Sequence, residues 1–136
     1  MSRSRFTLWS CLALLGLACE SDAEAKAEAG KLSHAIDSLR DADNSAKRPA
    51  LEQLRALPCS RPETCGVQSA CVAAYELHLR GLDGVAQGKQ QALAGDAGAD
   101  LPALIAAAQD SLERAKGLAQ KCADAQGELA RRYRLR

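Results

Sequence analysis

Aromatic side chains are scarce in this sequence, at 3% of the residues. The only phenylalanine and the only tryptophan, Phe6 and Trp9, lie close to the N-terminus. The two tyrosines, Tyr75 and Tyr133, are far apart along the chain. A platform on which nucleic-acid bases or sugars stack needs several exposed rings close together, so such a platform is not expected here.

β-Branched residues are also few, and no run alternates apolar and polar residues as a half-buried strand does. Alanine and leucine dominate the apolar residues, which predicts an all-α fold. Charges nearly balance: without Arg3 and Arg5, the 18 basic residues fall to 16 against 17 acidic ones, a net charge of about −1. A near-neutral chain gives no reason to expect nucleic acid as a partner.

The N-terminus carries the features of an export signal. Arg3 and Arg5 give a basic start, and an uncharged, mostly apolar run extends from Phe6 to Ala18. This run is too short to span a bilayer as a helix but suits the core of a signal peptide, so residues 1–18 are predicted to be one.

The cleavage region ends in Ala18 and Cys19 after a leucine-rich stretch, and it resembles the lipobox of bacterial lipoproteins. Gly16 and Leu17 stand in the reverse of the usual order, in which an aliphatic residue precedes a small one. In that class the cysteine thiol receives a diacylglycerol and the chain is cut just before it. The resemblance therefore implies that Cys19 is the site of lipid attachment.

The number of cysteines favours lipidation over a plain secretory signal. Cys11 leaves with the signal peptide, and the four cysteines after Cys19 can pair with one another. Unmodified, Cys19 would remain as a lone thiol. Glu20 in the next position implies, in the enterobacterial version of the class, the outer membrane rather than the inner one. We expect a protein anchored to the outer membrane and facing the periplasm, with a soluble secreted or periplasmic protein as the alternative.

The rest of the chain predicts one helical domain, residues 31–136, joined to the lipid by a polar, alanine-rich tether, residues 19–30. Leu32 to Leu57 show helical spacing that is interrupted between Asp41 and Pro49, so the first helix is expected to be kinked or broken.

A second helix is predicted to start at Ser60-Arg61-Pro62-Glu63, where Ser60 and Glu63 fit a capping box. Gly81, Gly84 and Gly88 weaken the prediction of its last turns. After a break at residues 95–98, a third helix begins at Asp100. We therefore expect a three-helix antiparallel bundle whose last two helices form a disulfide-linked hairpin.

The register of that hairpin predicts one of the disulfides. A turn centred between residues 96 and 97 places Cys71 opposite Cys122, and the same turn pairs Val85 with Ala108. Along the second helix, Cys65 and Cys71 would be ~9 Å apart, and Cys59 and Cys71 about 18 Å apart, both beyond disulfide reach. This excludes the other pairings and leaves Cys59–Cys65 with Cys71–Cys122. The four cysteines also lack the short ligand spacing of a zinc site.

Three groups of residues could be catalytic or metal-binding, and each has a simpler interpretation. His34, Asp37 and Ser38 share a helical face, but a serine within a helix has no oxyanion hole, so a solvated polar face is the better interpretation. His34 and His78 are expected about nine residues out of register, which argues against a shared haem or metal. The segment from Asp41 to Ser45 lacks the glycine and glutamate of a calcium loop. No catalytic residue, metal or cofactor is expected.

The basic C-terminus suits the end of a helix, and it also suits contact with anionic lipid headgroups or envelope polymers. Its candidate contact residues are Arg131, Arg132, Arg134 and Arg136. Asp37, Asp41 and Arg80 are further expected contacts. We expect a small non-catalytic structural or interaction module of the cell envelope, with a soluble effector or a small hydrolase as alternatives.

Overall fold

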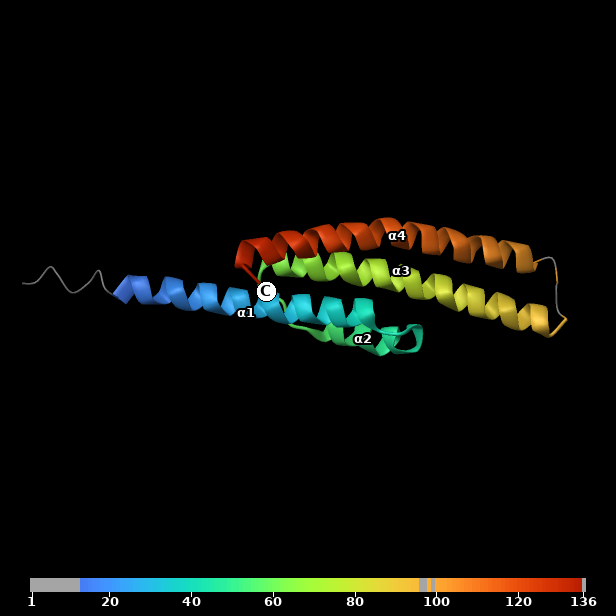
Figure 1. Cartoon of the computed structure of the whole chain (residues 1–136), viewed down its shortest axis with the longest axis horizontal. Coiled ribbons are helices and arrows are strands. Elements are labelled where there is room, and N and C mark those ends of the chain that lie inside the picture. Colours follow the sequence, from blue (N-terminus) through green and yellow to red (C-terminus); the bar gives the residue numbers. More distant parts are fainter. Residues whose placement is uncertain (1–12, 96–97, 99, 136) are drawn as a thin grey trace, which may run out of the picture.

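The computed structural model describes residues 13–95, 98 and 100–135, with side chains from residue 21 onward. This part of the chain forms four helices and no strand: α1 (Ala13–Asp41), α2 (Asn44–Ala56), α3 (Pro62–Leu93) and α4 (Asp100–Tyr133) (Figure 1). The all-α class is confirmed, whereas the expected count of three helices is wrong. The interruption in the first helix is complete, so the chain reverses and α2 runs back beside α1.

The break between α1 and α2 is stabilised by Lys47. Asp43 has extended dihedral angles (φ −61°, ψ 157°) and stands as the N-cap of α2. The Lys47 ammonium donates hydrogen bonds to the carbonyls of Leu39 and Arg40 at the end of α1, and to that of Ala42 just after it. A cation at the C-terminus of a helix satisfies carbonyls that lack intrahelical partners and complements the helix dipole.

Pro49 does not contribute to this break, although the sequence suggested that it would. It lies inside α2, close to the helix N-terminus. A proline there removes one intrahelical donor, and the helix continues to Ala56 because Leu51 and Leu54 are anchored in the core.

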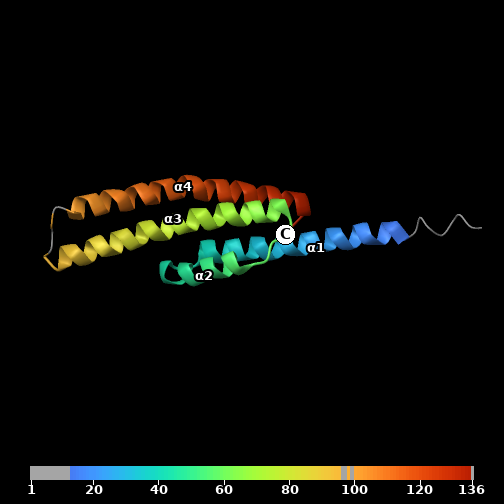
Figure 2. The same cartoon turned by 180° about the vertical axis from the view of Figure 1, so that it is seen from behind.

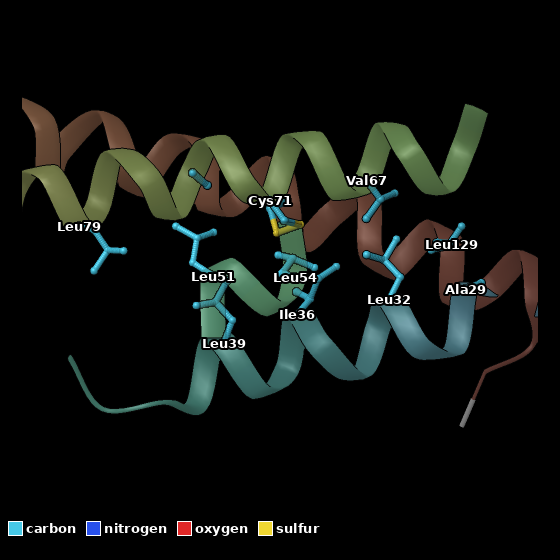
Figure 3. Close-up of a cluster of buried hydrophobic side chains, with 12 residues drawn as sticks. Ala29, Leu32, Ile36, Leu39, Leu51, Leu54, Val67, Cys71, Leu79 and Leu129 are labelled. Carbon is cyan, nitrogen blue, oxygen red and sulfur yellow. A yellow bond between two sulfur atoms is a disulfide. The ribbon is translucent and has the colours of Figure 1, made fainter. Parts of the chain in front are cut away.

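The core lies between the α1–α2 hairpin on one side and the first half of α3 with the second half of α4 on the other. Figure 3 shows Ile36, Leu51 and Leu54 gathered on the side of Cys71 that faces α1 and α2. The buried cluster consists of Ala29, Leu32, Ile36, Leu39, Leu51, Leu54, Val67, Cys71, Ala74, Leu79, Cys122 and Leu129. Ala25 and Ala29 are 2% and 0% exposed, so α1 packs into the bundle before residue 31, within the segment 19–30 that the sequence predicts as a tether.

The two ends of the bundle differ (Figures 1 and 2). At one end, here called the α1 end, α1 extends beyond the other helices, and the start of α3 (Arg61–Glu63) and the end of α4 (Arg131–Leu135) lie beside it. At the other end α3 and α4 continue past α2 as a two-helix extension, here called the projecting hairpin, Gly84–Leu93 with Asp100–Ala108.

Glycines let the two helices approach closely where the projecting hairpin begins. α3 continues through Gly81, Gly84 and Gly88 to Leu93, so the expected weakening of its last turns is absent. A methyl carbon on Gly84 would lie 2.8 Å from the Cβ of Ala108, and one on Gly81 would lie 2.5 Å from Leu112 Cγ. Gly84 thus takes the place opposite Ala108 that the sequence assigned to Val85, which is 46% exposed.

Gly84→Ala is expected to lower the free energy of unfolding by about 1 kcal/mol, because overpacking against Ala108 exceeds the gain in helix propensity. Gly117→Ala is the matched control in α4, where nothing lies within 4 Å of the added carbon. The control should gain about 0.5–1 kcal/mol. Urea unfolding followed by circular dichroism measures both, and equal stabilisation by the two changes would contradict the close packing.

Two disulfides join the described part of the chain, with the pairing that the sequence predicts. Cys59–Cys65 closes the turn before α3, with a Cα–Cα distance of 5.3 Å. Cys71–Cys122 joins α3 to α4 across the core, with a Cα–Cα distance of 4.8 Å. Cys71 and Cys122 are both buried, so their disulfide is part of the core.

Candidate functional site

Ser38 and Asp37, which share a face of the first helix with His34, form separate hydrogen bonds. The hydroxyl of Ser38 donates to the backbone carbonyl of His34, at 2.9 Å, and so bonds within its own helix. Asp37 instead accepts hydrogen bonds from Arg40 and from the buried amide of Gln126, both at 2.9 Å. Gln126 also donates to Ser33 and so ties α4 to α1. These polar groups are used for packing.

The two histidines lie in different parts of the bundle. His34 faces a shallow hollow shared with Arg134 and Leu135 at the end of α4. His78 is half-buried on α3 near Lys47, and burial followed by the Lys47 charge holds its pKa below the ordinary value of 6.5. Within the described residues, no three metal-ligating side chains are gathered. The Lys47 ammonium also occupies the carbonyls beside Asp41, where a calcium ion would need oxygen ligands.

The start of α3 is held by a carboxylate from α1. Glu28 accepts hydrogen bonds from the Ser60 amide, at 2.9 Å, and from the hydroxyls of Ser60 and Thr64. These bonds lower the pKa of Glu28 from 4.5 to about 2, the Ser60 hydroxyl contributing most. The expected capping box is wrong: Arg61 is the N-cap, and Ser60 bonds to Glu28 rather than to its own helix.

A polar hollow of about 410 Å³ lies at the α1 end, between α1, the start of α3 and the end of α4. Four cationic side chains line it, with two carboxylates and one phenol. The polar lining side chains are Lys26, Arg61, Arg132 and Arg134, together with Asp22, Glu63 and Tyr133. We call these seven residues the basic hollow. It brings together groups from three helices that are remote in sequence.

One of the two carboxylates is already engaged. Tyr133 donates a hydrogen bond of 2.6 Å to Glu63, and Arg132 lies 3.6 Å from the same carboxylate. The Tyr133 bond lowers the pKa of Glu63 and raises that of Tyr133. Arg61 donates to the backbone carbonyl of Ser21, at 2.7 Å, which fixes its guanidinium against α1.

The predicted basic tail ends α4 in an orderly turn. The Arg134 amide bonds to the Arg131 carbonyl and the Leu135 amide to the Ala130 carbonyl, the pattern of a Schellman motif. Arg134 takes the left-handed position, with φ 50°, and Leu135 folds back toward Gly30 of α1. Arg132 and Arg134 therefore reach the basic hollow, whereas Arg131 lines a neighbouring groove with Glu128. Arg136 lies outside the described residues.

Cys19 belongs to α1 and precedes Ser21, which bonds to Arg61 at the α1 end. Residues 1–12 of the predicted signal peptide lie outside the described part. Sequence reasoning found the C-terminal arginines but missed Lys26, Arg61 and Glu63 as their neighbours. No local signal would have shown this, because the hollow exists only once the register of α1 against α3 and α4 is known.

No protein-family model, no curated protein and no solved structure matches this chain. Among the described helices, none combines the length and the apolar character needed to cross a membrane.

Proposed function

We propose that this chain is a lipid-anchored protein of the bacterial cell envelope that acts as a small, non-catalytic interaction module. Its lipid is carried by Cys19, in the periplasmic leaflet of the outer membrane. The observation that carries the proposal is the direction of α1, which brings Cys19 to one end of the bundle while the α3–α4 hairpin projects from the other.

The short connection between Cys19 and the core supports this arrangement. From residue 21 onward, where side chains are described, Ala25 is the first buried residue of α1, and it follows Cys19 by about 9 Å along a continuous helix. A lipid on Cys19 would hold the α1 end against the membrane. The projecting hairpin would then point into the periplasm.

The two disulfides support an oxidising compartment, since such bonds persist in exported proteins and are rare in the bacterial cytosol. The exposed apolar side chains of Val85, Leu93 and Ile105 all lie on the projecting hairpin. They give this end a surface through which a protein partner in the envelope can be contacted.

The proposal is tested by labelling cells with radioactive palmitate and comparing wild type with Cys19→Ala. Wild type should carry label and sediment with membranes, whereas Cys19→Ala should carry none. A Cys59→Ala/Cys65→Ala variant is the control, because it also removes cysteines but should keep the label. Unlabelled wild-type protein in the soluble fraction would overturn the proposal and favour a soluble secreted protein.

A further inference from the structure

We propose that the basic hollow binds the phosphate-bearing headgroups of anionic phospholipids in the membrane to which the chain is attached. The inference rests on the lipid anchor proposed above, and it adds a second, electrostatic contact at the same end of the molecule. An acyl anchor combined with basic residues holds a protein on a membrane more firmly than either signal alone.

The hollow carries an excess of positive charge. Its cations outnumber its carboxylates, and Glu63 is already bonded to Tyr133 and near Arg132. Lys26 and Arg134 are exposed, and neither forms an ion pair with any described residue. The hollow thus presents donors that a phosphate can accept from, and guanidinium groups bind phosphate in a forked, bidentate geometry.

The basic hollow also lies close to Cys19, where the lipid would be attached. Lys26 follows Cys19 by about two turns of α1, or ~10 Å along the axis. The field of an anionic membrane surface falls off over about 8 Å at physiological salt. The Arg61 guanidinium of the hollow bonds to Ser21, which follows Cys19 by two residues or ~3 Å along the axis, so this part of the hollow lies within that distance. By contrast, Arg80 lies ~28 Å further along α3 than Arg61, where the field is screened.

Part of the hollow is also held in place before any ligand binds. Arg61 is fixed by its bonds to Ser21, and Arg134 is held by the turn that ends α4. The Arg61 guanidinium is thus in place before any ligand arrives, and the exposed Arg134 side chain starts from a fixed backbone. Preorganised donors lose less conformational entropy on binding than flexible ones.

The test measures binding of the unacylated mature chain, residues 19–136 with Cys19→Ser, exported so that both disulfides form. The chain is mixed with vesicles of phosphatidylglycerol and phosphatidylethanolamine, or with phosphatidylcholine alone, and sedimented. We expect binding to the anionic vesicles only. In K26Q/R132Q/R134Q the partition coefficient should fall on the order of 100-fold, since each basic side chain near an anionic surface contributes about fivefold.

The matched control is R80Q/K89Q/R114Q, which removes the same charge away from the α1 end and should bind within about twofold of wild type. A second variant, R132K/R134K, keeps the charge and should keep most of the binding. Equal losses in the hollow variant and the control, or no wild-type binding to anionic vesicles, would overturn the proposal. Acylation plays no part in this assay, so its outcome is independent of whether Cys19 is lipidated.

Discussion

Removing the Cys71–Cys122 disulfide is expected to lower the free energy of unfolding by about 4 kcal/mol, because this bond closes the longer of the two loops in the unfolded chain. The two cysteines are 51 positions apart, and both are buried. A loss of this size is a large share of the stability of a small domain. The variant is Cys71→Ala/Cys122→Ala, and urea unfolding followed by circular dichroism measures the change.

The control is Cys59→Ala/Cys65→Ala, in which the cysteines are separated by 6 positions. Loop closure there is less costly in entropy, so the expected loss is about 2 kcal/mol. Equal losses in the two variants, or a larger loss in the control, would contradict the central role of the α3–α4 link.

Glu28→Gln is expected to lower the free energy of unfolding by about 2 kcal/mol at pH 7, since charge-assisted hydrogen bonds are stronger than neutral ones and the site is partly open to solvent. The carboxylate of Glu28 accepts from the Ser60 amide and from the Ser60 and Thr64 hydroxyls, which fastens the start of α3 to α1. The amide that replaces it can accept through one oxygen only.

The stabilisation that Glu28 contributes is expected to decrease at low pH. The folded protein lowers the pKa of Glu28 from 4.5 to about 2, so the unfolded chain binds a proton more readily than the folded one. The stabilisation by Glu28 is therefore full above pH 4.5 and is lost as the pH falls toward 2. The stability difference between wild type and Glu28→Gln should shrink across this range.

Glu52→Gln serves as the comparison for that measurement. Glu52 pairs with Arg55 on an exposed surface of α2, where an ion pair contributes little. Its effect should stay below about 0.5 kcal/mol. A Glu28→Gln effect that is equally small, or that is unchanged between pH 7 and pH 2, would contradict the proposed linkage of α1 to α3.

The parts of the fold that the sequence predicts are those set by local periodicity and by register within a hairpin. The turn near residues 95–98 fixes which positions of α3 and α4 face each other, and this was sufficient to pair Cys71 with Cys122. The helix rise then excluded the alternative disulfides. Both inferences need only the geometry of regular helices.

Contacts between elements that are not adjacent along the chain could not be predicted in this way. The bond from Glu28 to Ser60 crosses from α1 to the start of α3, and it replaced the capping box that Ser60 and Glu63 suggested. The basic hollow likewise depends on how α1 meets α3 and α4.

The number of helices was misjudged for a physical reason. A kinked helix and a complete reversal have the same apolar spacing up to the break, so this spacing does not distinguish them. The reversal is stabilised by Lys47 of α2, which bonds to carbonyls at the end of α1. The glycines of α3 were misjudged similarly, because their cost in helix propensity is visible in the sequence and their contact with Ala108 is not.

The most direct test of the account is tandem mass spectrometry of the unreduced protein extracted from cell membranes. The account predicts a mature chain that begins at Cys19 and carries the added mass of a lipid. It also predicts disulfides that link Cys59 to Cys65 and Cys71 to Cys122. A mature N-terminus without lipid, or free thiols at residues 71 and 122, would contradict it.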